Sequence, residues 1–189
     1  YDLSKTMPIE DIKTIITAAT QCPSKQNIGF YDLHIITNQE VIKEIFETTT
    51  SIHSDEDEYQ GLSNPQVLGN MLLVFTEKPL TSKSRHRELN QALDNKQVSE
   101  NSRIVNNDRH VAVGIAAGYV NLVASLLGYE TGCCSCVMNY DKLKNTLGTS
   151  NMPILLMGVG FKNDGVNRKV HALAGSEQAE KNNWTKLFK

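Results

Sequence analysis

The longest apolar stretch of the chain, residues 106–127, constrains the fold more than any other feature. A helix built from it carries apolar residues on nearly every side, which predicts a buried central helix rather than a surface helix with one apolar stripe. One side of this helix stays thin enough for another backbone or a flat ligand to approach, because its residues are small: Gly114, Ala116, Ala117 and Gly118.

Shorter elements flank this helix on both sides. Apolar spacing and turn residues predict helices over 8–20, 38–48 and 140–147, and strands over 30–37, 71–76, 132–138 and 154–161. The strand over 71–76 is apolar on both faces and is therefore expected at the centre of a sheet. Helices and strands alternate, but the connections differ in length. The pattern favours an α+β or α/β layered domain over a regular doubly wound sheet.

No internal repeat or linker divides the chain, so residues 1–189 are expected to form a single domain. Residues 162–189 form a polar tail that ends in apolar residues, Trp184, Leu187 and Phe188. A tail of this kind usually docks on its own domain or on a partner.

Charge and cysteine content narrow the functional class. With 19 Lys and Arg against 21 Asp and Glu, the net charge of −2 gives no general attraction for nucleic acid or an acidic membrane. No unbroken run of about 18 apolar residues is present, so no membrane span is expected. Three of the four cysteines crowd into residues 133–136, which favours free thiols in a reducing cytosol, and hence a cytoplasmic protein.

Two short segments carry polar chemistry. The loop Cys22-Pro23-Ser24-Lys25-Gln26-Asn27 places a hydroxyl, an ammonium and an amide together, which could hold a flat polar ligand or a phosphate. The same residues are common in ordinary turns. The pair Arg168 and Lys169 follows the last strand and is either a phosphate clamp or a solvated charged pair.

The cysteine cluster has two readings. Thiolates bind zinc and iron–sulfur clusters, but the spacing is poor for a metal site and only Cys22 lies elsewhere in the chain. The alternative is a set of small buried residues in a crowded place. On a strand, Cys134 and Cys136 would share one face. No Gly-x-Gly-x-x-Gly or P-loop sequence supports a Rossmann or NTPase site.

The order of these features resembles the nitroreductase family of FMN-dependent NAD(P)H oxidoreductases. The loop Pro23-Ser24-Lys25-Gln26-Asn27 is similar to the Pro-Ser-x-x-Asn loop of that family. A Gly- and Ala-rich helix follows, then the turn and strand over 128–136, a strand from Pro153 to Gly160 with the pattern Pro-x₄-Gly-x-Gly, and the basic pair near the C-terminus.

The resemblance implies a three-layer α/β/α domain with a central, mostly antiparallel sheet. It implies an intertwined homodimer with two FMN sites at the interface and a tail, about 162–189, that wraps the partner. The chemistry would be carried by the flavin, with no catalytic side chain and no metal. The implied cofactor-binding residues are Pro23, Ser24, Lys25, Asn27, Asn64, Gln66, Cys134, Ser135, Cys136, Arg168 and Lys169.

Individual roles follow from position within the family motifs. Ser24 and Asn27 would contact the flavin edge and the ribityl chain, and Lys25 the phosphate or the ring. Asn64 or Gln66 would be a polar contact to the flavin. Residues 134–136 would present backbone to the reactive edge of the ring. The basic pair 168–169 would bind the phosphate.

The implied activity is hydride transfer from NAD(P)H through FMN to a nitroaromatic, quinone or similar electron-poor acceptor, by a ping-pong mechanism. The cofactor carries the difficult chemistry, so no acid–base dyad is needed. The alternatives are a specialised flavoenzyme that acts as a dehalogenase or cleaves flavin, a non-catalytic flavin-binding protein, and a metal-binding protein built on the cysteine cluster.

Overall fold

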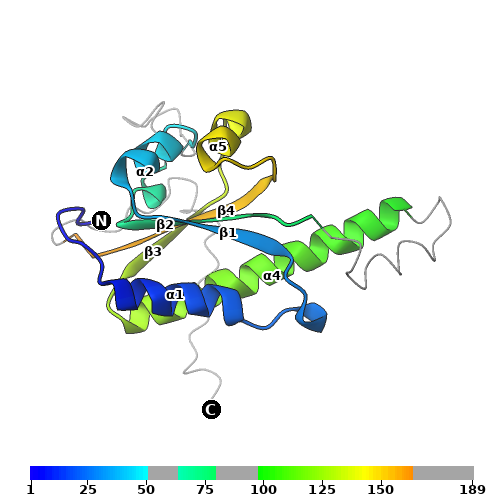
Figure 1. The fold of residues 1–189 in the computed structure, drawn as a ribbon, viewed down its shortest axis with the longest axis horizontal. Helices are drawn as coiled ribbons and strands as arrows, with labels where there is room; N and C mark the ends of the chain where they lie inside the picture. Colours follow the sequence, from blue (N-terminus) through cyan, green and yellow to red (C-terminus); the bar gives the residue numbers. More distant parts are fainter. Residues whose placement is uncertain (51–63, 80–97, 164–189) are drawn as a thin grey trace, which may run out of the picture.

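The computed structural model describes residues 1–50, 64–79 and 98–163, with no description of side chains for residues 98–105. Four strands form one antiparallel sheet in the order β1-β2-β4-β3: β1 (Tyr31–Ile36), β2 (Met71–Glu77), β4 (Pro153–Gly160) and β3 (Glu130–Cys134). One face of the sheet packs on α1 (Ile9–Gln21) and α4 (Val98–Leu126), and the other on α2 (Gln39–Phe46) and α5 (Tyr140–Leu147) (Figure 1). This arrangement confirms the predicted α+β fold with three layers.

Strand β2 is the centre of the core. Residues 71–76 are all 0% exposed, as the two-sided apolar pattern predicted. Side chains alternate across the strand, so Met71, Leu73 and Phe75 join the cluster beneath α1 and α4, while Leu72 and Val74 join the cluster beneath α2 and α5. Burial of one strand from both sides fixes the sheet between the two helical layers.

Local signals in the sequence set several helix ends. The side chain of Asn38 accepts hydrogen bonds from the amides of Glu40 and Val41, and so caps α2. The helix ends at Phe46, two residues before the predicted Thr48, and the Thr48 hydroxyl donates to the carbonyl of Ile45 at 2.6 Å. Gly148 ends α5 with a left-handed φ of 64°, as predicted.

The long helix α4 departs from its prediction. It begins at Val98, eight residues before the predicted start, and it is not buried all round. Ala116 and Ala117 face α1 and the sheet. The opposite side exposes Val111 (61%), Leu122 (59%) and Leu126 (79%), and Gly114 and Gly118 are exposed too, so the four small residues do not share one side. The helix therefore has an apolar face that the described part of its own chain does not cover.

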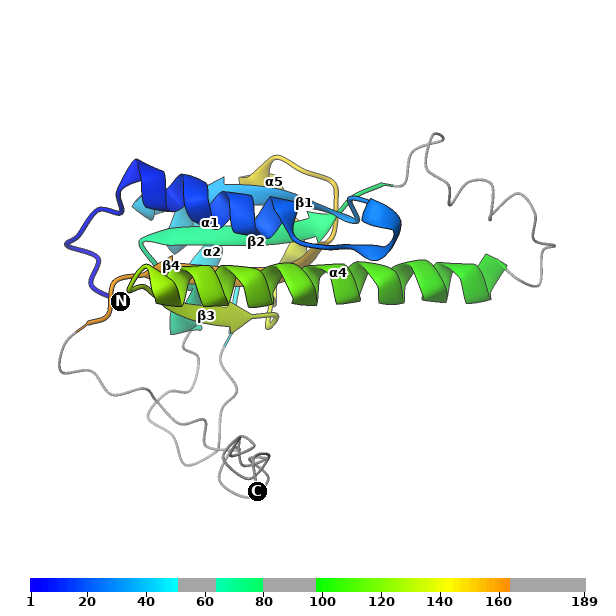
Figure 2. The same ribbon diagram turned by 90° about the horizontal axis from the view of Figure 1, so that it is seen from below.

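The same helix passes a simple test for a membrane span. Residues Asn106–Leu126 have a mean hydropathy of 1.2 over a window of which 28% is buried. This finding is weak, because core helices of soluble proteins have the same length and composition. Since α4 packs along α1 and next to the sheet (Figure 2), its apolar character on that side is explained by the core.

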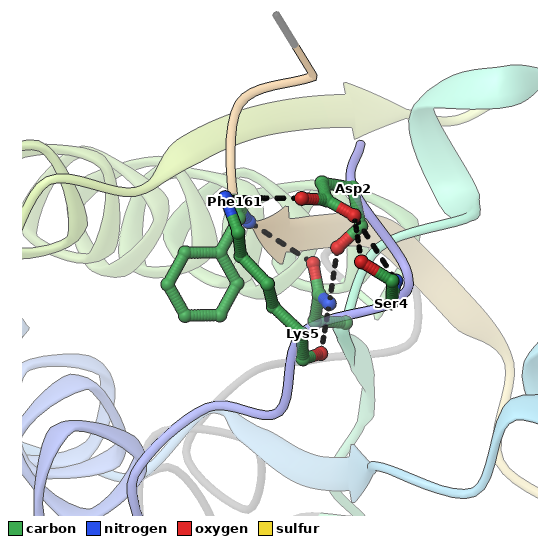
Figure 3. A network of polar contacts seen from close by, with 5 residues as sticks. Asp2, Ser4, Lys5 and Phe161 are labelled. Atoms are coloured by element: carbon green, nitrogen blue, oxygen red, sulfur yellow. Dashed lines mark hydrogen bonds and ion pairs between the residues drawn. The ribbon is translucent and has the colours of Figure 1, made fainter.

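The N-terminal segment is fastened to the sheet by the buried side chain of Asn70. Its amide nitrogen donates to the carbonyls of Asp2 (2.9 Å) and Lys5 (2.7 Å), and its oxygen accepts from the amide of Phe161 (3.0 Å). Asp2 in turn donates its amide to the carbonyl of Phe161, and its carboxylate accepts from Ser4 (Figure 3). All hydrogen-bonding groups of Asn70 are thus used to join the chain start to β2 and β4.

Close packing against glycine holds the 3₁₀ turn η2 (Pro65–Val67) on the sheet. A Cβ at Gly158 would lie 2.1 Å from the carbonyl oxygen of Gln66, and a Cβ at Gly132 would lie 2.8 Å from the Gln66 Cβ. Both distances are far below van der Waals contact, so this turn approaches the sheet only where side chains are absent.

We predict that Gly158→Ala destabilises the fold by about 1–3 kcal/mol, because the methyl group would collide with backbone rather than with a flexible side chain. Gly29→Ala is the matched control, since its nearest neighbour would be the end of the Lys78 side chain at 3.6 Å. Urea unfolding of the two variants and the parent chain measures the difference. Equal stability of the two variants would contradict this packing.

Candidate functional site

The first polar group lies on the loop after α1. A short 3₁₀ turn, η1 (Lys25–Asn27), closes it, with the Asn27 amide donating to the carbonyl of Ser24 at 3.1 Å. The Ser24 hydroxyl donates to the carbonyl of Ile28 at 2.8 Å. Gln26 and Asn27 have left-handed φ values of 54° and 56°. Such a conformation costs a non-glycine residue about 1–3 kcal/mol, and residues of this kind concentrate at binding sites.

The loop is tied to the long helix by charge. Lys25 Nζ lies 2.7 Å from the carboxylate of Asp108 on α4. The next residue of the helix, Arg109, pairs with Glu77 at 3.3 Å and donates to the carbonyl of Lys78 at 3.4 Å. The charge of Lys25 is therefore already balanced by Asp108. Its observed role is to hold the loop against α4, and a phosphate would have to compete with that pair.

The second polar group lies where η2 covers the end of β3. Asn64 caps this turn by accepting from the amide of Gln66 at 3.0 Å, and its own amide donates to the Thr49 hydroxyl at 3.1 Å. The side chain of Gln66 lies against Gly132, and Asn64 contacts the Cys134 thiol. The structure thus brings Asn64, Gln66 and residues 134–136 together.

The cysteine segment begins on a strand and then leaves it. The prediction of a strand over 132–138 was too long, because β3 ends at Cys134, which pairs with Leu156 of β4. Ser135 is exposed, and Cys134 is 3% exposed within the cluster beneath α2 and α5. Burial raises the pKa of the Cys134 thiol, and the amide of Cys136, which donates to this sulfur at 3.4 Å, opposes the rise.

The two groups are separate within one chain. The turn after α1 lies beside the N-terminal half of α4, away from β3, in both ribbon views (Figures 1 and 2). Its contacts run to Asp108, whereas those of Asn64 run to Thr49 and Cys134. The predicted phosphate ligands Arg168 and Lys169 lie outside the described residues. A single chain therefore presents two polar half-sites.

Sequence reasoning missed the partners that position these groups. Asp108 meets Lys25 across 83 positions of the chain, so no local pattern signalled this partly exposed ion pair. Thr49 gave no signal, because its contact with Asn64 spans 15 residues. An open depression of about 520 Å³ at the end of α5 contains none of the predicted site residues.

Comparison with known families places the chain. The model of the nitroreductase family matches residues 1–161, so this chain belongs to the nitroreductase family, a family of oxidoreductases. No curated protein sequence matches it.

Solved structures share the fold at low sequence identity. A candidate NAD(P)H:FMN oxidoreductase from Staphylococcus epidermidis superposes with a TM-score of 0.65 at 16% identity, covering 90% of this chain and 84% of that one. A candidate nitroreductase from Exiguobacterium sibiricum, in complex with FMN, gives 0.62 at 16% identity, covering 90% and 85%. An FMN-dependent nitroreductase from Clostridium difficile gives 0.57 at 12% identity, covering 95% and 90%.

Proposed function

We propose that this chain is an FMN-dependent oxidoreductase that forms a homodimer, with one FMN held at each of two sites between the subunits. Hydride would pass from NAD(P)H to a nitroaromatic, a quinone or a similar electron-poor acceptor. Family membership supports a flavin oxidoreductase in general. The similarity to an NAD(P)H:FMN oxidoreductase and to a structure holding FMN supports the finer assignment.

The observation that carries the proposal is the uncovered face of α4. Large apolar side chains lie along it at helical spacing: Val111, Tyr119, Leu122 and Leu126. Between them, a Cβ at Gly114 or Gly118 would meet nothing within 4 Å. A contiguous apolar stripe with small residues in its middle suits close packing against a second copy of the same helix.

A two-fold dimer would also complete the site. One chain holds the loop 23–27 and the group around Asn64 and Cys134 at separate places, so a ligand that touches both groups needs them from different subunits. We propose that the tail, about 162–189, wraps the partner and that Arg168 and Lys169 bind the phosphate. We also propose that residues 1–189 form a single domain and that the protein is cytoplasmic.

The described residues fit the edge of a flavin ring. Asn27 and Gln66 are exposed and carry amides that both donate and accept, which matches the mixed carbonyl and N–H edge of an isoalloxazine. FMN, when bound, supplies hydride acceptance and donation. The protein's part is to bind, orient and tune it.

Residues 134–136 would tune the cofactor through their backbone. A backbone N–H beside the reactive edge of the ring stabilises negative charge there and raises the reduction potential. Pro23, Ser24 and Lys25 would shape the opposite wall. NAD(P)H and the acceptor would bind in turn at the same open face, which gives ping-pong kinetics.

We expect the purified full-length protein to be yellow and to release FMN on denaturation, at one FMN per chain. Absorbance spectroscopy, mass spectrometry of the released ligand and light scattering test cofactor and oligomeric state together. A colourless protein that stays a monomer with excess FMN present would end the proposal.

Substitution on the uncovered face of α4 tests the dimer. Leu122→Glu places a charge at the centre of the proposed interface, so we expect it to yield monomers and to weaken FMN affinity at least tenfold. Thr17→Glu, on the exposed side of α1, is the control and should remain a flavin-bound dimer. Light scattering and FMN titration are the measurements. A Leu122→Glu dimer with normal affinity would refute this interface.

The cap of the turn η2 tests the site within one subunit. Asn64→Ala removes the side chain that caps this turn, and we expect a loss of about 1 kcal/mol in stability together with weaker FMN binding. Asn139→Ala removes an equivalent cap from α5, where Asn139 accepts from the Lys142 amide at 2.9 Å. Equal stability losses with weakened binding only in Asn64→Ala would support the proposal. Equal effects on binding would contradict it.

A further inference from the structure

The flavin proposal uses only the backbone of residues 134–136 and leaves two neighbouring thiols without a role. We propose that Cys134 and Cys136 form a reversible intramolecular disulfide, closed and opened by exchange with small disulfides and thiols. This segment would then be a redox modification site of the chain. The inference stands on the apoprotein and does not depend on flavin binding.

The backbone at this point is shaped for such a bond. In an extended strand, alternate residues lie about 7 Å apart, which is beyond the usual span of a disulfide. Here the strand ends at Cys134, and the Val137 amide donates to the carbonyl of Ser135 at 3.0 Å, forming a tight turn centred on Cys136. The Cys136 amide also folds back onto the Cys134 sulfur at 3.4 Å. This contact brings the backbone of Cys136 close to the Cys134 side chain.

Both thiols lie on the same side of the sheet. Cys134 belongs to the cluster beneath α2 and α5, and Cys136 packs against that cluster. Burial is the main cause of the raised pKa of Cys134, and the neighbouring Cys136 side chain adds to it. The sequence prediction that these residues share a face is thus confirmed, although a turn and not a continuous strand brings it about.

The other two cysteines are poor partners. Cys133 precedes Cys134 on the strand, so its side chain points to the opposite face, and it is exposed. Cys22 lies at the end of α1, where its thiol contacts Tyr31 of β1. Strands β1 and β3 are the two edges of the described sheet, with β2 and β4 between them. Three strand spacings, about 14 Å, separate Cys22 from the cluster.

The two thiols differ in exposure, and this difference determines which of them reacts first. Cys136 is partly exposed, whereas Cys134 is 3% exposed and burial raises its pKa. Of these two thiols, an incoming small disulfide therefore reaches Cys136 first. The Cys136 thiolate attacks one sulfur of that disulfide, forms a mixed disulfide and releases one small thiolate, which takes up the proton that Cys136 lost.

Ring closure completes the exchange. The Cys134 sulfur gives up its proton, attacks the Cys136 sulfur and displaces the second small thiol, which carries that proton away. The protein dithiol loses two electrons and two protons, and the small disulfide becomes two thiols. Excess small thiol reverses both steps. The surroundings need little change, since the Cys136 carbonyl is already held by the Thr50 amide at 3.0 Å.

Thiol counting on the full-length protein, with and without bound flavin, tests the inference. The protein is equilibrated with oxidised glutathione, quenched with acid, denatured and alkylated, and then weighed intact. Of the four thiols we expect those of Cys134 and Cys136 to be lost, with no glutathione retained on either, and a tryptic peptide containing residues 133–136 that carries their bond and is lighter by two hydrogens. Dithiothreitol should restore all four.

Single substitutions assign the bond. Cys134→Ser should accumulate a stable mixed disulfide with glutathione at Cys136, while Cys133→Ser and Cys22→Ser should close the bond as the parent chain does. A bond that forms in Cys136→Ser, or a parent chain that keeps four free thiols or a stable mixed disulfide, would overturn the inference. If the protein does not bind flavin but the disulfide closes normally, that result would contradict the proposed function and leave this inference intact.

Discussion

The long helix α4 has more apolar surface than the described part of its own chain covers. Both the core on one side of the helix and the proposed dimer on the other depend on this surface. One side of the helix packs on α1 and the sheet through small residues, which allows close approach. The other side leaves Leu122 and Leu126 in solvent. Exposing a stripe of this kind costs free energy that scales with its area, so association offers a large gain. In a family of flavin oxidoreductases, association through this face would join the two half-sites.

The half-sites themselves are built from backbone that other contacts hold in place. The left-handed turn at Gln26 and Asn27 persists because Lys25 is anchored to Asp108 and Ser24 closes the loop. The turn before β2 persists because Gly158 admits the carbonyl of Gln66. At Gln26 and Asn27 these contacts hold a conformation that the local sequence alone would not favour, whereas Asn64 and Pro65 favour the second turn locally.

The end of β3 shows how one short segment can serve two purposes. Its backbone lies beside Asn64 and Gln66, where the family resemblance places the cofactor, and its side chains bring two thiols to the same side of the sheet. Both properties come from the chain leaving the sheet after Cys134. A strand that continued to Met138, as the sequence pattern suggested, would have separated the sulfurs and carried the backbone past the site.

The sequence by itself determined what depends on neighbours along the chain. Asn38 caps its helix, Gly148 ends another, and the two-sided apolar run of β2 marks a central strand, because each is settled by residues a few positions away. Tertiary structure alone decided which face of α4 is covered, where β3 stops, and that Lys25 meets Asp108. Those outcomes depend on contacts between segments far apart in the sequence. The periodicity of one segment shows which of its faces is apolar but not which segment packs against it.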